Sequence, residues 1–215
     1  MSLTLKVSLP PITNSLTRYP ALFLLHGMGS DEEDIFSLFE SLKDRFILIA
    51  IQGQIPRGEG YAYFNILRIG YPELGSFESI LVQLKDTLDE SLQTYPIDPS
   101  QIFMAGFSQG AILSMSMAAR YGSLLKGIAA MHGYVPAHVS AENVADLQDV
   151  HVFIGHGIQD PMFSLAVGKA NAAFFMDRTP DVTFRTYPSG HWVDAAEKAD
   201  VLAWFDDFTT SLTSS

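Results

Sequence analysis

Cysteine is absent from the sequence, which excludes disulfide bonds, thiolate nucleophiles and cysteine-ligated metal sites. Basic residues are scarce: 13 Lys and Arg stand against 24 Asp and Glu, and the net charge is −11. With no cluster of basic residues, this charge argues against nucleic acid or an anionic membrane surface as a partner. Long apolar runs are also missing, because the longest, Ala21–Leu25 and Phe46–Ile51, are too short to span a bilayer.

The beginning of the sequence offers no targeting signal, since no apolar stretch of signal-peptide length precedes Pro10 and Pro11. Hydrophobic residues are abundant, at 47% of the chain, and charged residues make up 17%. A chain of 215 residues with this composition can fill one core. We therefore expect a cytoplasmic protein without integral membrane association, folded as a single domain over residues 1–215.

Short apolar runs alternate with segments of helical periodicity along the chain. Continuous apolar runs of strand length are typical of strands buried on both faces of a parallel sheet. Residues 3–9 instead alternate apolar and polar, which predicts an antiparallel edge strand. Buried strands are expected at residues 20–25, 46–51, 102–105, 126–131, 150–155 and 182–187. The pattern predicts an α/β fold with a mostly parallel central sheet and helices on both faces.

Helices are expected between these strands, at residues 30–43, 76–94, 164–177 and 192–208. The run Ser30–Glu33 reads as a capping box for the first helix, and Ser76 as the N-cap of the second. Four residues of the last helix are expected to face the core: Ala195, Ala199, Leu202 and Phe205. Only one short helix, at residues 141–147, fits between the strands at 126–131 and 150–155, so we expect no large cap domain.

The motif Gly106-Phe107-Ser108-Gln109-Gly110 lies between an apolar strand and a helix of small residues. A bare G-x-S-x-G occurs by chance in roughly one chain in ten or twenty of this length, so its context decides its meaning. At a strand-to-helix junction it predicts a nucleophile elbow, a sharp turn that exposes the hydroxyl of Ser108. The alternative is a glycine-rich turn with an inactive serine.

A serine hydroxyl needs a base to take its proton and a carboxylate to orient that base. In a fold of this kind the order along the chain is serine, acid and histidine, each after a later strand. Asp160 fits the acid, because it follows the strand at 150–155, whereas Asp181 and Asp194 lie at the wrong ends of their elements. The alternative for Asp160 is a turn residue before Pro161.

The sequence contains six histidines, and the order of elements favours one of them as the base. His191 follows the last strand and precedes the last helix, which is the expected place. His132 also ends a strand on the same edge and is the main rival, but it precedes Asp160 in the chain. His26 and His156 each precede a glycine at a strand end, so we expect them to make local hydrogen bonds.

Acyl transfer by a serine also needs backbone N–H groups that stabilise the oxyanion. Gln109, directly after Ser108, offers one such group at the start of a helix. Met28 offers the second, in the turn His26-Gly27-Met28-Gly29 after the first buried strand. The alternative for Met28 is an ordinary glycine turn with a core methionine.

The substrate pocket is expected beside these groups. Between Gln52 and Gly75 the periodicity stops and glycine, proline and aromatic residues dominate, which is typical of a functional segment. We expect this segment to wall an open, shallow, apolar site that favours short to medium acyl chains. The predicted substrate-binding residues are His132, Met162, Phe163, Tyr63 and Phe64, with His132 lining the site without acting as the base.

Together these residues resemble the phospholipase/carboxylesterase branch of the α/β-hydrolases. The resemblance covers nearly the whole chain and rests on Leu24–Asp31, Gly106–Gly110, Gly155–Gly157 with Asp160-Pro161, and Gly190-His191. It implies an α/β-hydrolase fold, a Ser108–His191–Asp160 triad, oxyanion N–H groups from Met28 and Gln109, and no cofactor or metal. Two departures, Tyr63-Phe64-Asn65 and His132-Gly133, lie in expected pocket walls and bear on the substrate.

We therefore predict a serine carboxylesterase that hydrolyses small to medium acyl esters, or thioesters, through an acyl-enzyme on Ser108. A lysophospholipase or an acyl-protein thioesterase would share every catalytic residue. A hydrolase fold that only binds a ligand is the non-enzymatic alternative, because fold does not fix function. The expected partner is a small-molecule ester, and a homodimer is compatible with the sequence.

Overall fold

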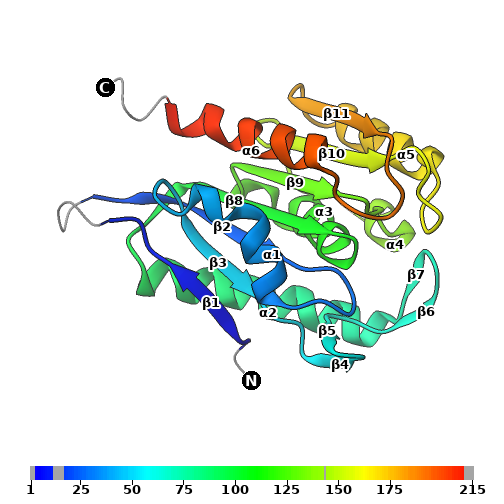
Figure 1. Cartoon of the computed structure of the whole chain (residues 1–215), viewed down its shortest axis with the longest axis horizontal. Coiled ribbons are helices and arrows are strands. Elements are labelled where there is room, and N and C mark those ends of the chain that lie inside the picture. Colours follow the sequence, from blue (N-terminus) through cyan, green and yellow to red (C-terminus); the bar gives the residue numbers. More distant parts are fainter. Residues whose placement is uncertain (1–2, 12–16, 143, 211–215) are drawn as a thin grey trace.

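The structure, a computed structural model, describes residues 3–11, 17–142 and 144–210. A seven-stranded sheet forms its centre, with the strands β1 (Leu5–Ser8), β2 (Tyr19–Leu25), β3 (Ile47–Ile51), β8 (Ile97–Phe107), β9 (Gly127–Met131), β10 (His151–Gly157) and β11 (Val182–Tyr187). Their order across the sheet is β1-β3-β2-β8-β9-β10-β11 (Figure 1). Only β1 is antiparallel to its neighbour, and it lies at one edge as expected.

Helices cover both faces of this sheet. They are α1 (Glu32–Phe39), α2 (Leu74–Thr94), α3 (Gln109–Tyr121), α4 (Ala137–Ser140), α5 (Leu165–Met176) and α6 (Ala195–Thr210), with short 3₁₀ turns at Glu40–Leu42 and Gly122–Leu124. Figure 1 shows α1 and α6 on one face, with α2, α3 and α5 on the other. The predicted α/β-hydrolase architecture, with a mostly parallel sheet and helices on both faces, is confirmed.

The apolar runs are continuous because each strand is buried on two sides. In β2, Ala21 and Phe23 pack into the core under α2, α3 and α5, while Leu22 and Leu24 pack into the core under α1 and α6. In the second core, the rings of Phe39, Phe46 and Phe103 each lie edge-on to Phe205, at centroid distances of 5.8 to 5.9 Å. Burying each such ring contributes about 1.5–3 kcal/mol, which fixes α6 on the sheet.

The ends of the first two helices differ from the sequence prediction. The N-cap of α1 is Asp31, whose carboxylate accepts the N–H of Asp34, while Ser30 donates its hydroxyl to the Asp34 side chain. The N-cap of α2 is Glu73, whose side chain accepts the N–H groups of Gly75 and Ser76. The prediction of Ser76 as cap was wrong because its hydroxyl instead accepts the N–H of Asn65.

Two other helix predictions were also wrong. The short helix between β9 and β10 is α4, at Ala137–Ser140, rather than at residues 141–147. In the described part of this connection α4 is the only helix, so no large cap covers the sheet there. The last helix begins at Ala195. Of the four residues expected to face the core, Phe205 is buried and Leu202 packs against the core partly buried, but Ala195 and Ala199 are exposed. Glu197 and Val201 complete the buried face in their place.

The aperiodic segment 52–75 contains two small hairpins. They pair β4 (Ile55–Arg57) with β5 (Gly60–Ala62), and β6 (Ile66–Arg68) with β7 (Tyr71–Pro72). Figure 1 shows both hairpins at the end of the sheet near α2. Within the described ranges, no helix is both long and apolar enough to cross a membrane.

Candidate active site

Four polar side chains follow four neighbouring parallel strands at their carboxyl ends. Ser108 follows β8, His132 follows β9, Asp160 lies in the loop after β10, and His191 lies between β11 and α6. The carboxyl ends of parallel strands meet at one edge of a sheet, which is where α/β folds place their sites. The strand order therefore brings together residues that lie up to 83 positions apart in the chain.

Ser108 occupies a strained backbone conformation at the junction of β8 and α3. Its φ of 52° and ψ of −110° lie outside the regions that ordinary residues favour. The turn is held by the Ser108 N–H, which donates to the Met131 carbonyl at 2.9 Å, and by the Gly110 N–H, which donates to the His26 carbonyl at 3.1 Å. A side chain at Gly106 would collide with the backbone of Gly110. The local geometry is that of a nucleophile elbow.

A hydrogen-bonded relay runs from this serine to a buried carboxylate. His191 Nε2 lies 2.9 Å from Ser108 Oγ, and His191 Nδ1 lies 2.8 Å from Asp160 Oδ2. An ionised carboxylate only accepts hydrogen bonds, so Nδ1 of His191 carries the proton there. The lone pair of Nε2 then faces the Ser108 hydroxyl, which is the arrangement that a general base requires.

Asp160 is held by four donors. Its Oδ1 accepts the N–H groups of Met162 and Phe163 at 2.8 and 2.9 Å, and its Oδ2 faces both His191 and His132. Burial alone would raise the pKa of this carboxyl, but the hydrogen bonds, above all those from His191 and Phe163, lower its pKa to about 2. Asp160 therefore stays ionised at neutral pH although its side chain is fully buried.

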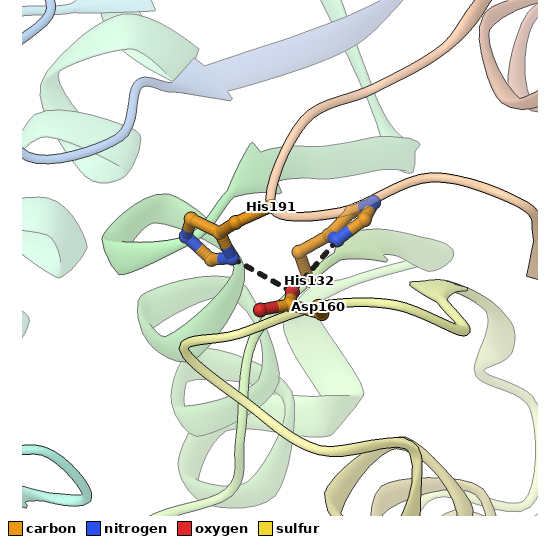
Figure 2. A group of neighbouring side chains, drawn as sticks. All are labelled: His132, Asp160 and His191. Carbon is orange, nitrogen blue, oxygen red and sulfur yellow. Dashed lines mark hydrogen bonds and ion pairs between the residues drawn. The ribbon is translucent and has the colours of Figure 1, made fainter.

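His132 does not line a pocket, and the prediction that it would is wrong. Its side chain is fully buried, with Nδ1 3.0 Å from Asp160 Oδ2 and Nε2 2.8 Å from Glu197 Oε2. Figure 2 shows the imidazoles of His132 and His191 approaching Asp160 from two sides. The two carboxylates hold His132 inside the protein, where no substrate can reach it. Of the two histidines, His191 is the one that contacts Ser108.

Tyr63 and Phe64 are also interior residues rather than pocket walls. The Tyr63 hydroxyl donates to the Ile51 carbonyl at 2.5 Å and accepts the His26 N–H at 3.0 Å, while Phe64 packs edge-on against Phe77. The Gln109 side chain accepts the Tyr63 N–H and donates to the Phe64 carbonyl. This dipeptide therefore ties the segment before the hairpin β6–β7 to the elbow, and its side chains are not available to a ligand.

The turn expected to supply one of the two oxyanion donors, the Met28 N–H, adjoins the elbow. A Cβ built on Gly27 would lie 3.5 Å from the Ser108 Cβ, so the Gly27–Gly29 turn packs directly beside the serine. Met28 lies within this turn, and its side chain is half exposed. Gln109 is the first residue of α3, and the first N–H groups of a helix have no acceptor within the helix. Both predicted donors are thus placed on the Ser108 side of the sheet edge.

Two clefts open beside these groups. The larger, of about 680 Å³, has a wall that includes Asp160, Tyr134, Met162 and Phe163, with Ile69–Tyr71 contributed by the aperiodic segment. The smaller, of about 290 Å³, includes Phe107, His191 and Trp192 in its wall. Met162 and Phe163 therefore lie where the sequence predicted them, at a largely apolar surface next to Asp160.

The remaining predicted histidine roles agree with the structure. His26 Nδ1 donates to the Gly27 carbonyl at 2.7 Å and Nε2 accepts the Gly53 N–H at 2.9 Å, while burial lowers its pKa. His156 Nε2 donates to the Phe163 carbonyl at 2.8 Å. Both make the local hydrogen bonds that were expected.

His132, Asp160 and His191 each offer one atom that could bind a metal ion, and these three atoms lie within 4.8 Å of one another. The two imidazole contacts to Asp160, at 2.8 and 3.0 Å, have hydrogen-bond length. Nitrogens and oxygens that share a tetrahedral ion at ~2.0–2.1 Å would be separated by about 3.3 Å. The two imidazole–carboxylate distances are therefore explained by hydrogen bonds rather than by a shared metal ion.

Glu197 is the residue at this site that sequence reasoning missed. It lies in the first turn of α6, fully buried, 65 positions from its partner His132. A signal was present, because Glu197, Val201 and Phe205 follow at intervals of four and share one helical face. A carboxylate on an apolar face indicates a buried partner, since unpaired charges are rarely buried.

Comparisons with known proteins find relatives over most of the chain. A sequence model described as Phospholipase/Carboxylesterase matches residues 12–207. The putative hydrolase MhqD of Bacillus subtilis is 25% identical over 186 residues, which cover 86% of this chain and 92% of that protein. Acyl-protein thioesterase 1 of Debaryomyces hansenii is 26% identical, with 93% of this chain and 97% of that protein covered.

Among solved structures, the Bacillus cereus carboxylesterase superposes with a TM-score of 0.85 at 25% identity, covering 95% of this chain and 94% of that one. The esterase PE8, at 21% identity, shares the fold with a TM-score of 0.80. The family match extends from residue 12 to residue 207 and includes Ser108, Asp160 and His191. The chain belongs to the phospholipase/carboxylesterase family and is a serine hydrolase that acts on ester bonds.

Proposed function

We propose that this protein is a carboxylesterase in which Ser108 is the nucleophile, His191 the general base and Asp160 the residue that orients His191. The observation that carries the proposal is the continuous relay from Ser108 Oγ through His191 to Asp160, at 2.9 and 2.8 Å. The strained backbone at Ser108 adds support, because it keeps the hydroxyl at the head of the turn.

The proposed reaction has two halves. Ser108 Oγ attacks the ester carbonyl carbon while His191 Nε2 takes the hydroxyl proton, and a tetrahedral intermediate forms. The intermediate collapses when His191 returns this proton to the leaving alcohol, which departs and leaves the acyl group on Ser108. Water then attacks the acyl-enzyme with His191 again as base, and the acid is released as Ser108 regains its proton.

Charge stabilisation in this scheme comes from two directions. The N–H groups of Met28 and Gln109 are proposed to bind the oxyanion, and removal of one such donor typically costs about a hundredfold or more in rate. On the other side, Asp160 remains anionic, since the hydrogen bonds from His191 and Phe163 hold its pKa at about 2 against the effect of burial. A fixed anion at this position stabilises the His191 imidazolium that forms in each half-reaction.

The nucleophile assignment is tested by a fluorophosphonate probe, which reacts with an activated serine. We expect stoichiometric labelling of the wild-type protein, with the label on the peptide that contains Ser108. The matched control is Ser116→Ala, which removes a buried hydroxyl from α3 that bonds only to the Ile112 carbonyl. Labelling at a serine other than Ser108, or no labelling of folded protein, would contradict the proposal.

For the substrate, we propose small to medium acyl esters. The larger cleft, of about 680 Å³, lies next to Asp160 and is walled by Met162, Phe163 and Tyr134. Phe163 also contacts the His191 ring at a centroid distance of 5.4 Å, so an acyl chain in this cleft would start beside the base. Apolar clefts with few polar groups suit acyl chains, and methionine adapts to their shape.

A panel of p-nitrophenyl esters from acetate to palmitate tests the chain-length proposal. We expect the highest kcat/KM between acetate and octanoate, with palmitate at least roughly tenfold lower. Met162→Trp should shift the preference toward acetate, since Met162 lies half exposed at the cleft. Met176→Trp is the control, because Met176 is exposed at the far end of α5 and should leave the preference unchanged. A preference for palmitate would contradict this part of the proposal.

Thioester substrates belong in the same panel, because three relatives are named acyl-protein thioesterases. An acyl thioester and an oxygen ester of the same acyl chain differ only in the leaving group. We expect the oxygen ester to have the higher kcat/KM. The reverse order would identify a thioesterase with the same catalytic residues.

A further inference from the structure

His132 and Glu197 form a fully buried pair that hydrogen-bonds to the carboxylate of Asp160. His132 Nδ1 lies 3.0 Å from Asp160 Oδ2, and His132 Nε2 lies 2.8 Å from Glu197 Oε2. The side chains of all three residues have no exposure to solvent. The proposed reaction does not use this pair, since neither residue lines either cleft and their side-chain hydrogen bonds go to Asp160 and to each other rather than to Ser108.

Each contact of His132 requires a hydrogen between its two atoms. Two oxygens of buried carboxyl groups face the two ring nitrogens, and a nitrogen lone pair facing a carboxylate oxygen would be repelled. Asp160 is ionised, so Nδ1 of His132 donates to it. A second hydrogen lies between His132 Nε2 and Glu197 Oε2, bonded to one of these two atoms. The His132–Glu197 pair is therefore neutral as a unit, and Asp160 carries the one uncompensated charge of the cluster.

The surroundings agree with a shared proton. Burial lowers the pKa of His132, but hydrogen bonds to Glu197 and Asp160 raise it above its usual value, and burial raises the pKa of Glu197. Glu197 Oε1 is buried without a hydrogen-bond partner among the described residues, which would be costly for a full carboxylate charge. The titratable groups that face His132 are Asp160, Glu197, His156 stacked at 5.6 Å, and His191 at 5.7 Å with its ring nearly perpendicular.

The backbone is shaped around this pair. His132 has a φ of 55°, a left-handed conformation that is uncommon outside glycine, although asparagine, aspartate and histidine adopt it more often than other residues. Its N–H donates to the Gly155 carbonyl at 3.0 Å. A side chain on Gly155 would collide with the Glu197 carboxylate. The glycine at this position of β10 therefore provides the space that Glu197 occupies beside His132. An uncommon backbone conformation at His132 and the close approach of Glu197 to Gly155 occur together, which indicates that the fold specifies this pair.

We infer that His132 and Glu197 are positioning residues that fix the Asp160 carboxylate for His191. The inference rests on the proposed triad. Two backbone N–H groups hold Asp160 Oδ1, and Oδ2 is the oxygen that His191 needs. His132 holds Oδ2 from the protein interior, and Glu197 in turn orients the His132 ring. The partly exposed His191 thus meets an acceptor whose position does not depend on His191 itself.

Two substitutions at His132 separate its hydrogen bond from its bulk. His132→Leu fills the space but has no donor for Asp160. His132→Asn places an amide N–H near the position of Nδ1 and tolerates the left-handed backbone. We expect His132→Leu to lower kcat roughly tenfold or more with KM within about twofold, and His132→Asn to retain most of kcat. Fluorophosphonate labelling of Ser108 should slow in parallel.

A second pair covers the case in which His132→Leu does not fold. Glu197→Leu removes the partner of His132, and Glu197→Gln keeps a side-chain amide at Nε2; we expect only the former to lower kcat. Val201→Ala is the stability control, because Val201 is buried one turn further along α6 and is expected to lower the melting temperature while kcat stays within about twofold.

The inference would be overturned by folded His132→Leu, or by folded Glu197→Leu if the former does not fold, with the kcat of the wild type. It would equally be overturned if both members of a pair lost kcat to the same extent, since the hydrogen bond would then not matter. A failure of the triad itself looks different, because the wild-type protein would then carry no label at Ser108.

Discussion

Ser108→Ala is expected to lower kcat/KM for a short p-nitrophenyl ester by about a thousandfold or more. The Ser108 hydroxyl is the group that His191 Nε2 faces at 2.9 Å, and alanine leaves no nucleophile at the head of the elbow. Asp160 and His191 keep their contact, so the variant should fold and still bind substrate. The measurement is steady-state hydrolysis of purified variant and wild type, with melting temperatures recorded for both.

The matched control for Ser108→Ala is again Ser116→Ala in the same helix. Ser116 is fully buried and lies two turns from Ser108, with its hydroxyl bonded to the Ile112 carbonyl at 2.7 Å. This control should keep kcat/KM within a factor of about three. If Ser108→Ala hydrolysed the ester within a few-fold of wild type, then Ser108 would not be the nucleophile.

His191→Ala is expected to cost about a thousandfold or more in kcat. His191 joins Ser108 Oγ and Asp160 Oδ2, so its loss leaves the hydroxyl without a base and the carboxylate without its catalytic partner. His132 cannot replace it, because His132 is buried beneath Asp160 and already bonded at both ring nitrogens. The measurement is the pre-steady-state and steady-state rate with the same ester.

His151→Ala provides the comparison for this histidine. His151 is the first residue of β10, at the opposite end of the strand from Asp160, and it pairs with Asp181 near the surface. Its removal should leave kcat unchanged within about twofold. An active His191→Ala variant together with an inactive His151→Ala variant would show that the base had been assigned to the wrong end of the sheet.

The order of elements was predictable because each strand is buried on both faces and therefore reads as a continuous apolar run. The G-x-S-x-G motif placed Ser108 after β8, and the order of elements then placed Asp160 and His191 after β10 and β11, where the structure has them. Helix ends were less predictable. Glu73 and Asp31 cap their helices in competition with nearby serines, and the choice depends on the N–H groups each side chain reaches.

The interior polar residues were harder to predict for a physical reason. Burial of a polar group depends on its partner, and the partner of Glu197 lies 65 positions away in the chain. His132 was placed in the pocket wall because it ends a strand on the catalytic edge, and Tyr63 and Phe64 because they belong to the aperiodic segment 52–75. In the structure, hydrogen bonds to Glu197, Ile51 and His26 hold the first two inside, and Phe64 packs on Phe77. A place at a strand end or in an aperiodic segment does not reveal which way a side chain points.

The most direct test of the acyl-enzyme mechanism is mass spectrometry of protein quenched during turnover of p-nitrophenyl acetate. The assignment of Ser108 and His191 predicts a transient acetylated species, with the acetyl group on the peptide that contains Ser108 and absent from Ser108→Ala. Hydrolysis by the wild type with no acetylated protein at any time, or acetylation at another residue that is required for turnover, would contradict it.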